Sequence, residues 1–219
     1  MIAALFVATD GCYFGLPEVE PWDKTRDARK YAGPHPVVAH PPCQLWGPMA
    51  NVNYARWGGE HNRPGNDRGC FASALLSVQS FGGVLEHPAL SRAWAAHGLP
   101  APNGSGWQRV CSDWSETDWH AGWVCEVWQS AYGHRANKAT WLYAKTPEPP
   151  PELHWDRRAG SHQIGYQDQR GKAANKPTVS KKEASATPPE FREVLLDIAR
   201  RAAKPLNQAA AAHMEGTTS

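Results

Sequence analysis

A cysteine in a proline-rich turn is the residue of this chain best suited to covalent chemistry. Residues 40–44 read His-Pro-Pro-Cys-Gln and directly follow the apolar run 37–39. Two consecutive prolines have fixed φ angles and no N–H groups, so they form a stiff turn that presents Cys43 outward. A thiolate held in this way can act as a nucleophile, and His40 is near enough to help stabilise it.

Addition to C6 of a pyrimidine ring is one reaction that needs such a thiolate. The addition turns C5 into an enamine carbon that can attack an electrophile. It also needs a carboxylic acid that hydrogen-bonds to N3 as the ring gains electron density. The predicted helices and strands must therefore place a carboxyl group beside Cys43.

Apolar runs and one amphipathic segment predict a β-α-β arrangement. Residues 3–9, 37–39 and 84–85 are predicted strands, and residues 66–81 are a predicted helix that Gly82-Gly83 ends. Such units favour an α/β fold with a mainly parallel, Rossmann-like sheet and flanking helices. Asp10, Cys43 and Glu86 each follow a predicted strand, so we expect them on one rim of the sheet.

The later residues complete a single predicted domain, made of residues 1–146 and 187–203. Residues 123–129 and 139–144 are β-prone and are predicted to be neighbouring strands. Residues 147–186 are rich in Pro, Gly and Lys and are predicted to be a mobile loop. A capping box at 187–190 predicts the start of a last helix, and residues 204–219 are expected to be a frayed tail.

Three segments carry a resemblance to a known family. Residues 37–43 read Val-Val-Ala-His-Pro-Pro-Cys, residues 84–88 read Val-Leu-Glu-His-Pro, and residues 128–142 contain Trp-Gln-Ser-Ala-Tyr-Gly-His and Lys-Ala-Thr-Trp-Leu. In this order they resemble DNA cytosine-5 methyltransferases, in the His-Pro-Pro-Cys form of phage-encoded members. The resemblance covers roughly residues 36–145 and implies a methyltransferase-like fold.

The resemblance implies a role for each matching position. Cys43 would be the nucleophile and Glu86 the acid that contacts the cytosine. The positions that would bind the substrate are His40, Pro42, Gln44, His87, Gln129, His134 and Arg135. His87 stands where the family has asparagine.

The family's cofactor is S-adenosylmethionine, which a Gly-rich loop after the first strand cradles. Asp10, Gly11 and Gly15 would form a reduced version of this loop, and Asp23 or Asp27 would replace the acidic residue that contacts the ribose. The stretch from here to the Pro-Cys turn is shorter than in the family. The fold is therefore expected to be shortened in its N-terminal, cofactor-binding half.

Charge is distributed unevenly along a chain whose net charge is only +2. Residues 157–182 hold seven basic residues and one acidic residue, with Trp155 and Tyr166 in and beside them. Such a segment is either a solvated loop or a contact for phosphates and bases. The four positions predicted to contact a DNA backbone are Lys172, Lys176, Lys181 and Lys182.

The five cysteines are odd in number and show no Cys-x-x-Cys pair. This favours free thiols in a reducing cytoplasm, the host's if the chain is phage-encoded, with Cys12, Cys70, Cys111 and Cys125 as packing residues. No Cys or His pair has the spacing of a zinc site, so no metal is expected. No run of 18 apolar residues occurs, so no membrane partner is expected either.

Three hypotheses remain open at this point. The first is a DNA cytosine-5 methyltransferase-like transferase. The second keeps the ring chemistry but modifies C5 of a free pyrimidine nucleotide with another one-carbon donor. The third is a non-enzymatic DNA-binding derivative that keeps the frame and lacks the cofactor pocket.

Overall fold

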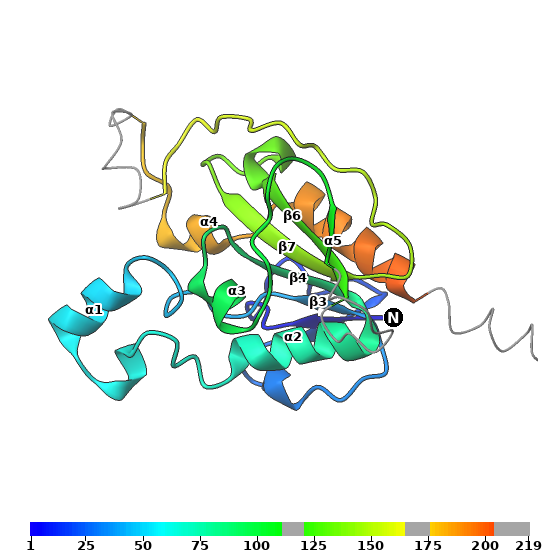
Figure 1. Cartoon of the computed structure of the whole chain (residues 1–219), viewed down its shortest axis with the longest axis horizontal. Helices are drawn as coiled ribbons and strands as arrows, with labels where there is room; N and C mark the ends of the chain where they lie inside the picture. Colours follow the sequence, from blue (N-terminus) through cyan, green and yellow to red (C-terminus); the bar gives the residue numbers. More distant parts are fainter. Residues whose placement is uncertain (111–120, 165–175, 204–219) are drawn as a thin grey trace, which may run out of the picture.

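The apolar runs form strands of a single sheet. The computed structural model describes residues 1–110, 121–164 and 176–203 (Figure 1). The strands are β1 (Ile2–Leu5), β2 (Val19–Trp22), β3 (Val37–Ala39), β4 (Gly83–Pro88), β5 (Gln108–Val110), β6 (Gly122–Trp128) and β7 (Ala139–Lys145). They pair in the order β2-β1-β3-β4-β7-β6-β5.

Helices connect and cover these strands. The α-helices are α1 (Ala50–Trp57), α2 (Cys70–Phe81), α3 (Arg92–Ala96), α4 (Lys181–Ser185) and α5 (Pro189–Ala202). Short 3-10 helices are η1 (Ala28–Lys30), η2 (Glu60–Asn62) and η3 (Gln129–Tyr132). Figure 1 shows α2 lying along the sheet and α1 projecting away from it.

Most strands of the sheet run in the same direction. β1 is parallel to β2 and β3, and β3 is parallel to β4. β7 is antiparallel to both β4 and β6, and β5 is antiparallel to β6. Only β5 and β7 are therefore reversed within the described sheet, and the predicted α/β fold with a mostly parallel, helix-flanked sheet is confirmed.

The alternation of strand side chains produces two cores, one on each face of the sheet. On one face α5 contributes Phe191, Leu195 and Ile198 to a core that includes Val38 and Val84. On the other face α2 contributes Phe71 and Val78 to a core that includes Ala39 and Leu85. The two helices thus cover opposite faces of the same strands.

Two elements at the sheet edge differ from the sequence prediction. β1 ends at Leu5, earlier than predicted, and the structure has the strand β2 at Val19–Trp22, where no strand is predicted from the sequence. Pro21 lies within β2 and has no N–H group to donate to a neighbouring strand. However, β2 is an edge strand and pairs on one side alone, and proline is compatible with such strands.

The predicted helices are present with different starting points. α2 begins at Cys70, later than predicted, because Asp67 accepts hydrogen bonds from the amides of Gly69 and Phe71. The capping box was wrong, because α5 begins after Pro188 without a side-chain cap, although Pro189 does occupy its first turn. Gly83 opens β4, where a Cβ atom would lie 1.9 Å from the carbonyl oxygen of Val37.

The segment predicted to be a mobile loop makes contacts where the structure describes it. His162 bridges to Ala136, Thr178 bridges to Gln163, and Leu153 is buried in the core under α5. Its mobility stays a prediction, and Lys172 and the predicted tail 204–219 lie outside the described residues.

No helix in the described ranges combines the length and apolar character needed to cross a bilayer.

Candidate active site

The strand order creates a switch point next to β1. After β1 the chain goes to the edge strand β2 and then crosses to β3 on the other side of β1. In open α/β sheets, ligands bind beyond the carboxyl ends of the strands at such a point. The turn that carries Cys43 begins there, directly after β3.

The parallel register of β3 and β4 brings His40 next to Glu86. Ala39 is paired with Leu85, so the following residues of the two strands lie side by side. Both point to the face covered by α5, because they alternate with Ala39 and Leu85 on the α2 face. Glu86 lies inside β4 and not just after it as predicted.

A chain of hydrogen bonds runs through these two residues. His40 Nδ1 lies 3.0 Å from Glu86 Oε2, and His40 Nε2 lies 2.8 Å from the Tyr13 hydroxyl. Gln129 donates from Nε2 to Glu86 Oε1 at 2.9 Å and lies 2.9 Å from Thr140 Oγ1. Glu86 is only 7% exposed and Gln129 is fully buried. The network therefore joins five separate segments in a nearly dry environment.

The network keeps Glu86 ionised. Burial alone would raise the pKa of this carboxyl group, but the hydrogen bond from His40 and the positive charge of Lys138 outweigh it and lower the pKa to about 2. At neutral pH Glu86 is thus a carboxylate whose two oxygens each accept a hydrogen bond.

Cys43 is partly exposed in the turn, and its thiol is protonated at rest. Its carbonyl oxygen accepts a hydrogen bond from the Trp46 amide, and the Trp46 indole donates to Asp67 at 2.9 Å. Burial raises the pKa of Cys43 and the negative charge of Glu86 raises it further, while Lys138 opposes them. No hydrogen bond from His40 to this thiol is present, because both ring nitrogens face Tyr13 and Glu86.

His87 lies close to the backbone of Pro41 and Pro42 in the turn. It is fully buried on the α2 face, with Phe71 edge-on at 5.1 Å and Trp94 stacked at 6.4 Å between ring centroids. Neither ring nitrogen has a hydrogen-bond partner of proper geometry. Burial lowers the pKa of His87 to about 4, against the opposing charge of Glu86, so the ring is neutral at pH 7.

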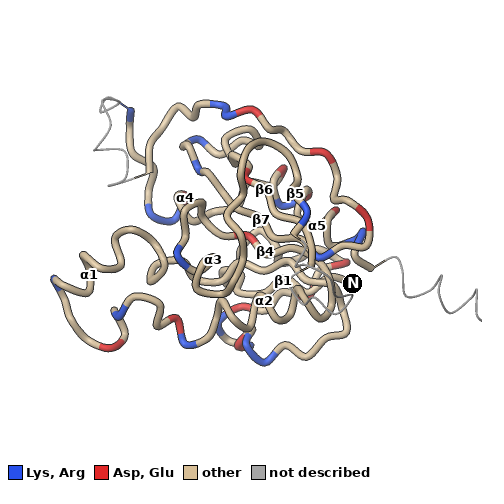
Figure 2. Tube along the Cα trace, viewed as in Figure 1, with Lys and Arg blue, Asp and Glu red and all other residues tan. Residues whose placement is uncertain are grey.

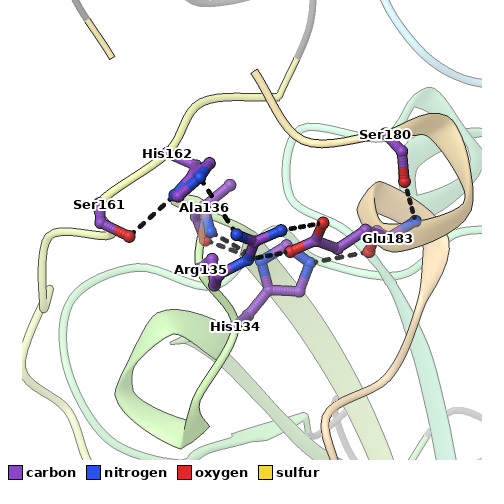
Figure 3. Close-up of polar contacts among 7 residues, drawn as sticks. All are labelled: His134, Arg135, Ala136, Ser161, His162, Ser180 and Glu183. Carbon is purple, nitrogen blue, oxygen red and sulfur yellow. Dashed lines mark hydrogen bonds and ion pairs between the residues drawn. The ribbon is translucent and has the colours of Figure 1, made fainter. Parts of the chain in front are cut away.

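The other residues predicted to bind substrate are divided between two places. Pro42 and Gln44 are exposed in the turn beside Cys43. His134 and Arg135 point to α4 (Figure 3), where Arg135 pairs with Glu183 at 2.5 Å and His134 Nε2 lies 3.1 Å from the Glu183 carbonyl oxygen. These two residues fasten α4 to the loop before β7.

The predicted cofactor residues lie after β1 and β2. Residues 6–18 form turns without a helix, and Gly11 closes one of these turns by donating to the Ala8 carbonyl oxygen. Asp10 and Gly15 are exposed there. Asp23 directly follows β2, where an acidic residue could contact a ribose.

The Asp23 carboxylate, however, is already engaged within the chain. Oδ2 accepts from the Thr9 hydroxyl at 2.6 Å, which lowers the pKa of Asp23, and Oδ1 accepts from the amides of Thr25 and Arg26. The side chain is buried. Together with a connection that contains no helix, this does not fit the cradle that the resemblance implies for S-adenosylmethionine.

The lysines predicted to contact DNA differ in their exposure and in their contacts. Lys181 and Lys182 are exposed in the first turn of α4, whose basic positions are visible in Figure 2. Lys176 donates to the Gly160 carbonyl oxygen at 2.6 Å. Lys172 lies outside the described residues.

Sequence reasoning missed three members of the site. Tyr13 is 2% exposed and reads as an ordinary core aromatic. Thr140 reads as a strand residue, and Lys138, whose charge acts on both Glu86 and Cys43, reads as a loop residue. The Lys138 ammonium also donates to the Ala186 carbonyl oxygen at 3.0 Å. No local spacing signals these roles, because each depends on pairing between distant segments.

Three other described cysteines are free thiols, and the described residues form no metal-binding cluster. Cys12, Cys70 and Cys125 are free, and Cys111 lies outside the described residues. Among the residues that the structure describes, no group of three or more His, Cys, Asp or Glu side chains is arranged to hold a metal ion.

Comparison of the chain with family models, curated proteins and solved structures found no match in any of the three.

The neutral, buried state of His87 predicts a pH-dependent stability. Its pKa is lower in the folded chain than the ordinary value of 6.5, so the unfolded chain binds a proton first as pH falls. Stability from this group is complete above about pH 6.5 and is lost progressively towards pH 4. Between pH 7.5 and 5 we expect a loss of about 2 kcal/mol in the free energy of unfolding.

Urea unfolding of the wild type and His87→Phe at several pH values measures this loss. The variant should lack the part of the pH dependence that His87 contributes. Parallel profiles for the two proteins would show that His87 is not held neutral.

Proposed function

We propose that the chain catalyses cytosine-5 chemistry of the DNA methyltransferase kind, with Cys43 as nucleophile and Glu86 as the group that hydrogen-bonds to N3. One observation carries this proposal: a buried carboxylate and a turn-borne thiol share one rim of the sheet, close enough for the charge of Glu86 to raise the pKa of Cys43. A thiol and a carboxyl group are the two functions that addition to a pyrimidine requires.

The chemistry divides between the two residues. The Cys43 thiolate adds to C6, the ring electrons move toward N3, and C5 gains nucleophilic character. Glu86, held by His40 and Gln129, faces the N3 edge and, once it carries a proton, neutralises the negative charge that develops there. C5 then attacks a one-carbon electrophile, and loss of the C5 proton with departure of the thiolate restores the ring. A cytosine in duplex DNA would have to be flipped out to reach this rim.

Exchange of the C5 hydrogen tests the addition step without any donor. The enamine takes a deuteron from solvent at C5, loses the original proton and expels Cys43, so the substrate gains deuterium. We expect the wild type to exchange this hydrogen in a cytosine-containing oligonucleotide followed by mass spectrometry. Cys43→Ser should abolish exchange, and Glu86→Gln should lower it by about 10²-fold or more.

Cys70→Ser is the matched control, because Cys70 begins α2 and makes no contact with the network. It should exchange at the wild-type rate. Full exchange by Cys43→Ser would contradict the nucleophile assignment. DNA binding by a wild type that shows no exchange would instead favour the non-enzymatic derivative.

The one-carbon donor defines a second candidate, in which a donor other than S-adenosylmethionine serves the same ring chemistry. The internal hydrogen bonds of Asp23 and the helix-free connection after β1 favour it. A free pyrimidine nucleotide is the alternative substrate in this case, and comparing exchange in deoxycytidine monophosphate with exchange in the oligonucleotide separates the two.

Calorimetry distinguishes the donors. We expect no heat of binding when S-adenosylmethionine is titrated to millimolar concentration, because Asp23 has no exposed carboxylate to offer a ribose. If S-adenosylmethionine bound with micromolar affinity and Asp23→Asn abolished this binding, S-adenosylmethionine would be the favoured donor.

DNA as the partner is supported by the position of α4. Arg135 and Lys138 fasten this helix to the loop before β7, and Lys138 also acts on Glu86 and Cys43. The exposed Lys181 and Lys182 thus stand on a helix tied to the proposed site. Phosphates that they neutralise would release counterions.

The salt dependence of DNA binding measures this contribution. Changing Lys181 and Lys182 together to Ala should lower the slope of log affinity against log salt by about one to two units. Arg200 and Arg201, at the end of α5 beside Gly82, lie at the opposite end of the strands, so the same change there should leave the slope unaltered. Equal slopes for all three proteins would remove α4 from the DNA contact.

A further inference from the structure

The imidazole of His40 can carry a proton, a property to which the proposed cytosine chemistry assigns no role. Its two nitrogens lie 3.0 Å from Glu86 and 2.8 Å from Tyr13, and its side chain is 13% exposed. Within the described residues, it is the one titratable side chain that hydrogen-bonds to Glu86. Lys138 acts on the same carboxylate through its positive charge alone, and the buried His87 next to it in β4 is neutral at pH 7.

The partners of His40 determine where its proton lies. An ionised carboxylate only accepts hydrogen bonds, so Nδ1 must carry a proton toward Glu86. In the neutral ring Nε2 is then an acceptor, and the Tyr13 hydroxyl donates to it. A hydroxyl can also accept, so Tyr13 can hydrogen-bond to Nε2–H when the ring is protonated. Burial raises the pKa of Tyr13 well above 10, so Tyr13 keeps its own proton in both states.

Glu86 needs a proton that it does not hold at rest. As a carboxylate with both oxygens already accepting, it cannot donate to N3 while the ring gains electrons. The thiol has the opposite problem, because Cys43 must lose a proton before it can attack. One proton moved from the thiol to the carboxylate side would satisfy both requirements.

We propose that His40 supplies Glu86 with the proton that Glu86 passes to N3, and that Tyr13 holds the ring so that this proton faces the carboxylate. The role rests on the proposed cytosine chemistry. The proton leaves the Cys43 thiol, directly or through water at the rim, and enters the His40–Glu86 pair. The thiolate lone pair forms the S–C6 bond, the C5=C6 pair becomes C4=C5, and the C4=N3 pair takes the proton at N3.

This exchange of a proton also removes an electrostatic obstacle. The negative charge of Glu86 raises the pKa of Cys43, so the resting pair opposes formation of the thiolate. Once the pair has taken up a proton its net charge is zero. Uptake of the proton by the pair and release of the Cys43 thiolate are thus coupled, and no external acid or base is required.

His40→Asn tests the role, because an asparagine amide can donate to Glu86 but cannot take up and release a proton. We expect the C5-hydrogen exchange rate at neutral pH to fall about 10²-fold with little change in oligonucleotide binding. The difference in exchange rate between the wild type and His40→Asn should become smaller as pH is lowered. At low pH the wild-type His40–Glu86 pair takes its proton from solvent, so it can no longer accept the proton of the Cys43 thiol. A merely structural role would give a deficit that does not vary with pH.

Two further measurements keep the inference falsifiable. Tyr13→Phe keeps the ring in the core and should lower exchange by a smaller factor of about 10, while His154→Asn, on an exposed residue, should change nothing. The ring nitrogens of His40, observed by nitrogen-15 NMR, should show the Nδ1–H tautomer in the wild type. The Nε2–H tautomer would overturn the inference whatever the activity.

The exchange measurements test the role of His40 separately from the proposed cytosine-5 chemistry. No exchange by the wild type overturns both. Exchange that requires Cys43, together with a His40→Asn variant that keeps the wild-type rate and pH profile, overturns the role of His40 alone.

Discussion

The parallel pairing of β3 with β4 is the constraint on which the candidate site depends. The register that pairs Ala39 with Leu85 sets His40 beside Glu86 on one face and leaves His87 on the other. A shift of one residue would send Glu86 into the α2 core and bring His87 into the network. Both cores, with apolar side chains in strict alternation, oppose such a shift.

Electrostatics then links the two reactive groups. Glu86 is ionised at rest, and its negative charge together with burial raises the pKa of the Cys43 thiol. The resting thiol is therefore protonated and poorly nucleophilic. In the proposed reaction, the Cys43 thiol becomes a nucleophile when its proton moves to the His40–Glu86 pair, and this transfer would accompany substrate binding. The positive charge of Lys138 favours the ionised form of Glu86 and opposes the rise in the pKa of Cys43, and its hydrogen bond to Ala186 ties that charge to α4.

The sequence predicted those parts of the fold that depend on local pattern. The alternation and apolar runs at β3, β6 and β7, and the stripe of α2, predict these elements closely, and the α/β class follows from their order. β2 and the start of α5 could not be read, because edge position and the fixed backbone of two prolines overrode the local signals. For the site, Cys43 and Glu86 stand out in short motifs, whereas Tyr13 and Lys138 acquire their importance only through contacts between distant segments.

The last described helix has a consequence for how the protein is made. α5 covers the face of the sheet that carries His40 and Glu86, and Arg192 on it donates to the Cys12 carbonyl oxygen at 2.8 Å. During synthesis all seven strands leave the ribosome before this helix does, so the apolar face around Val38 and Val84 waits uncovered. Long-range closure of this kind is slow and exposes the nascent chain to aggregation. The chemical centre is therefore completed only after α5 has been synthesised and has packed onto the sheet.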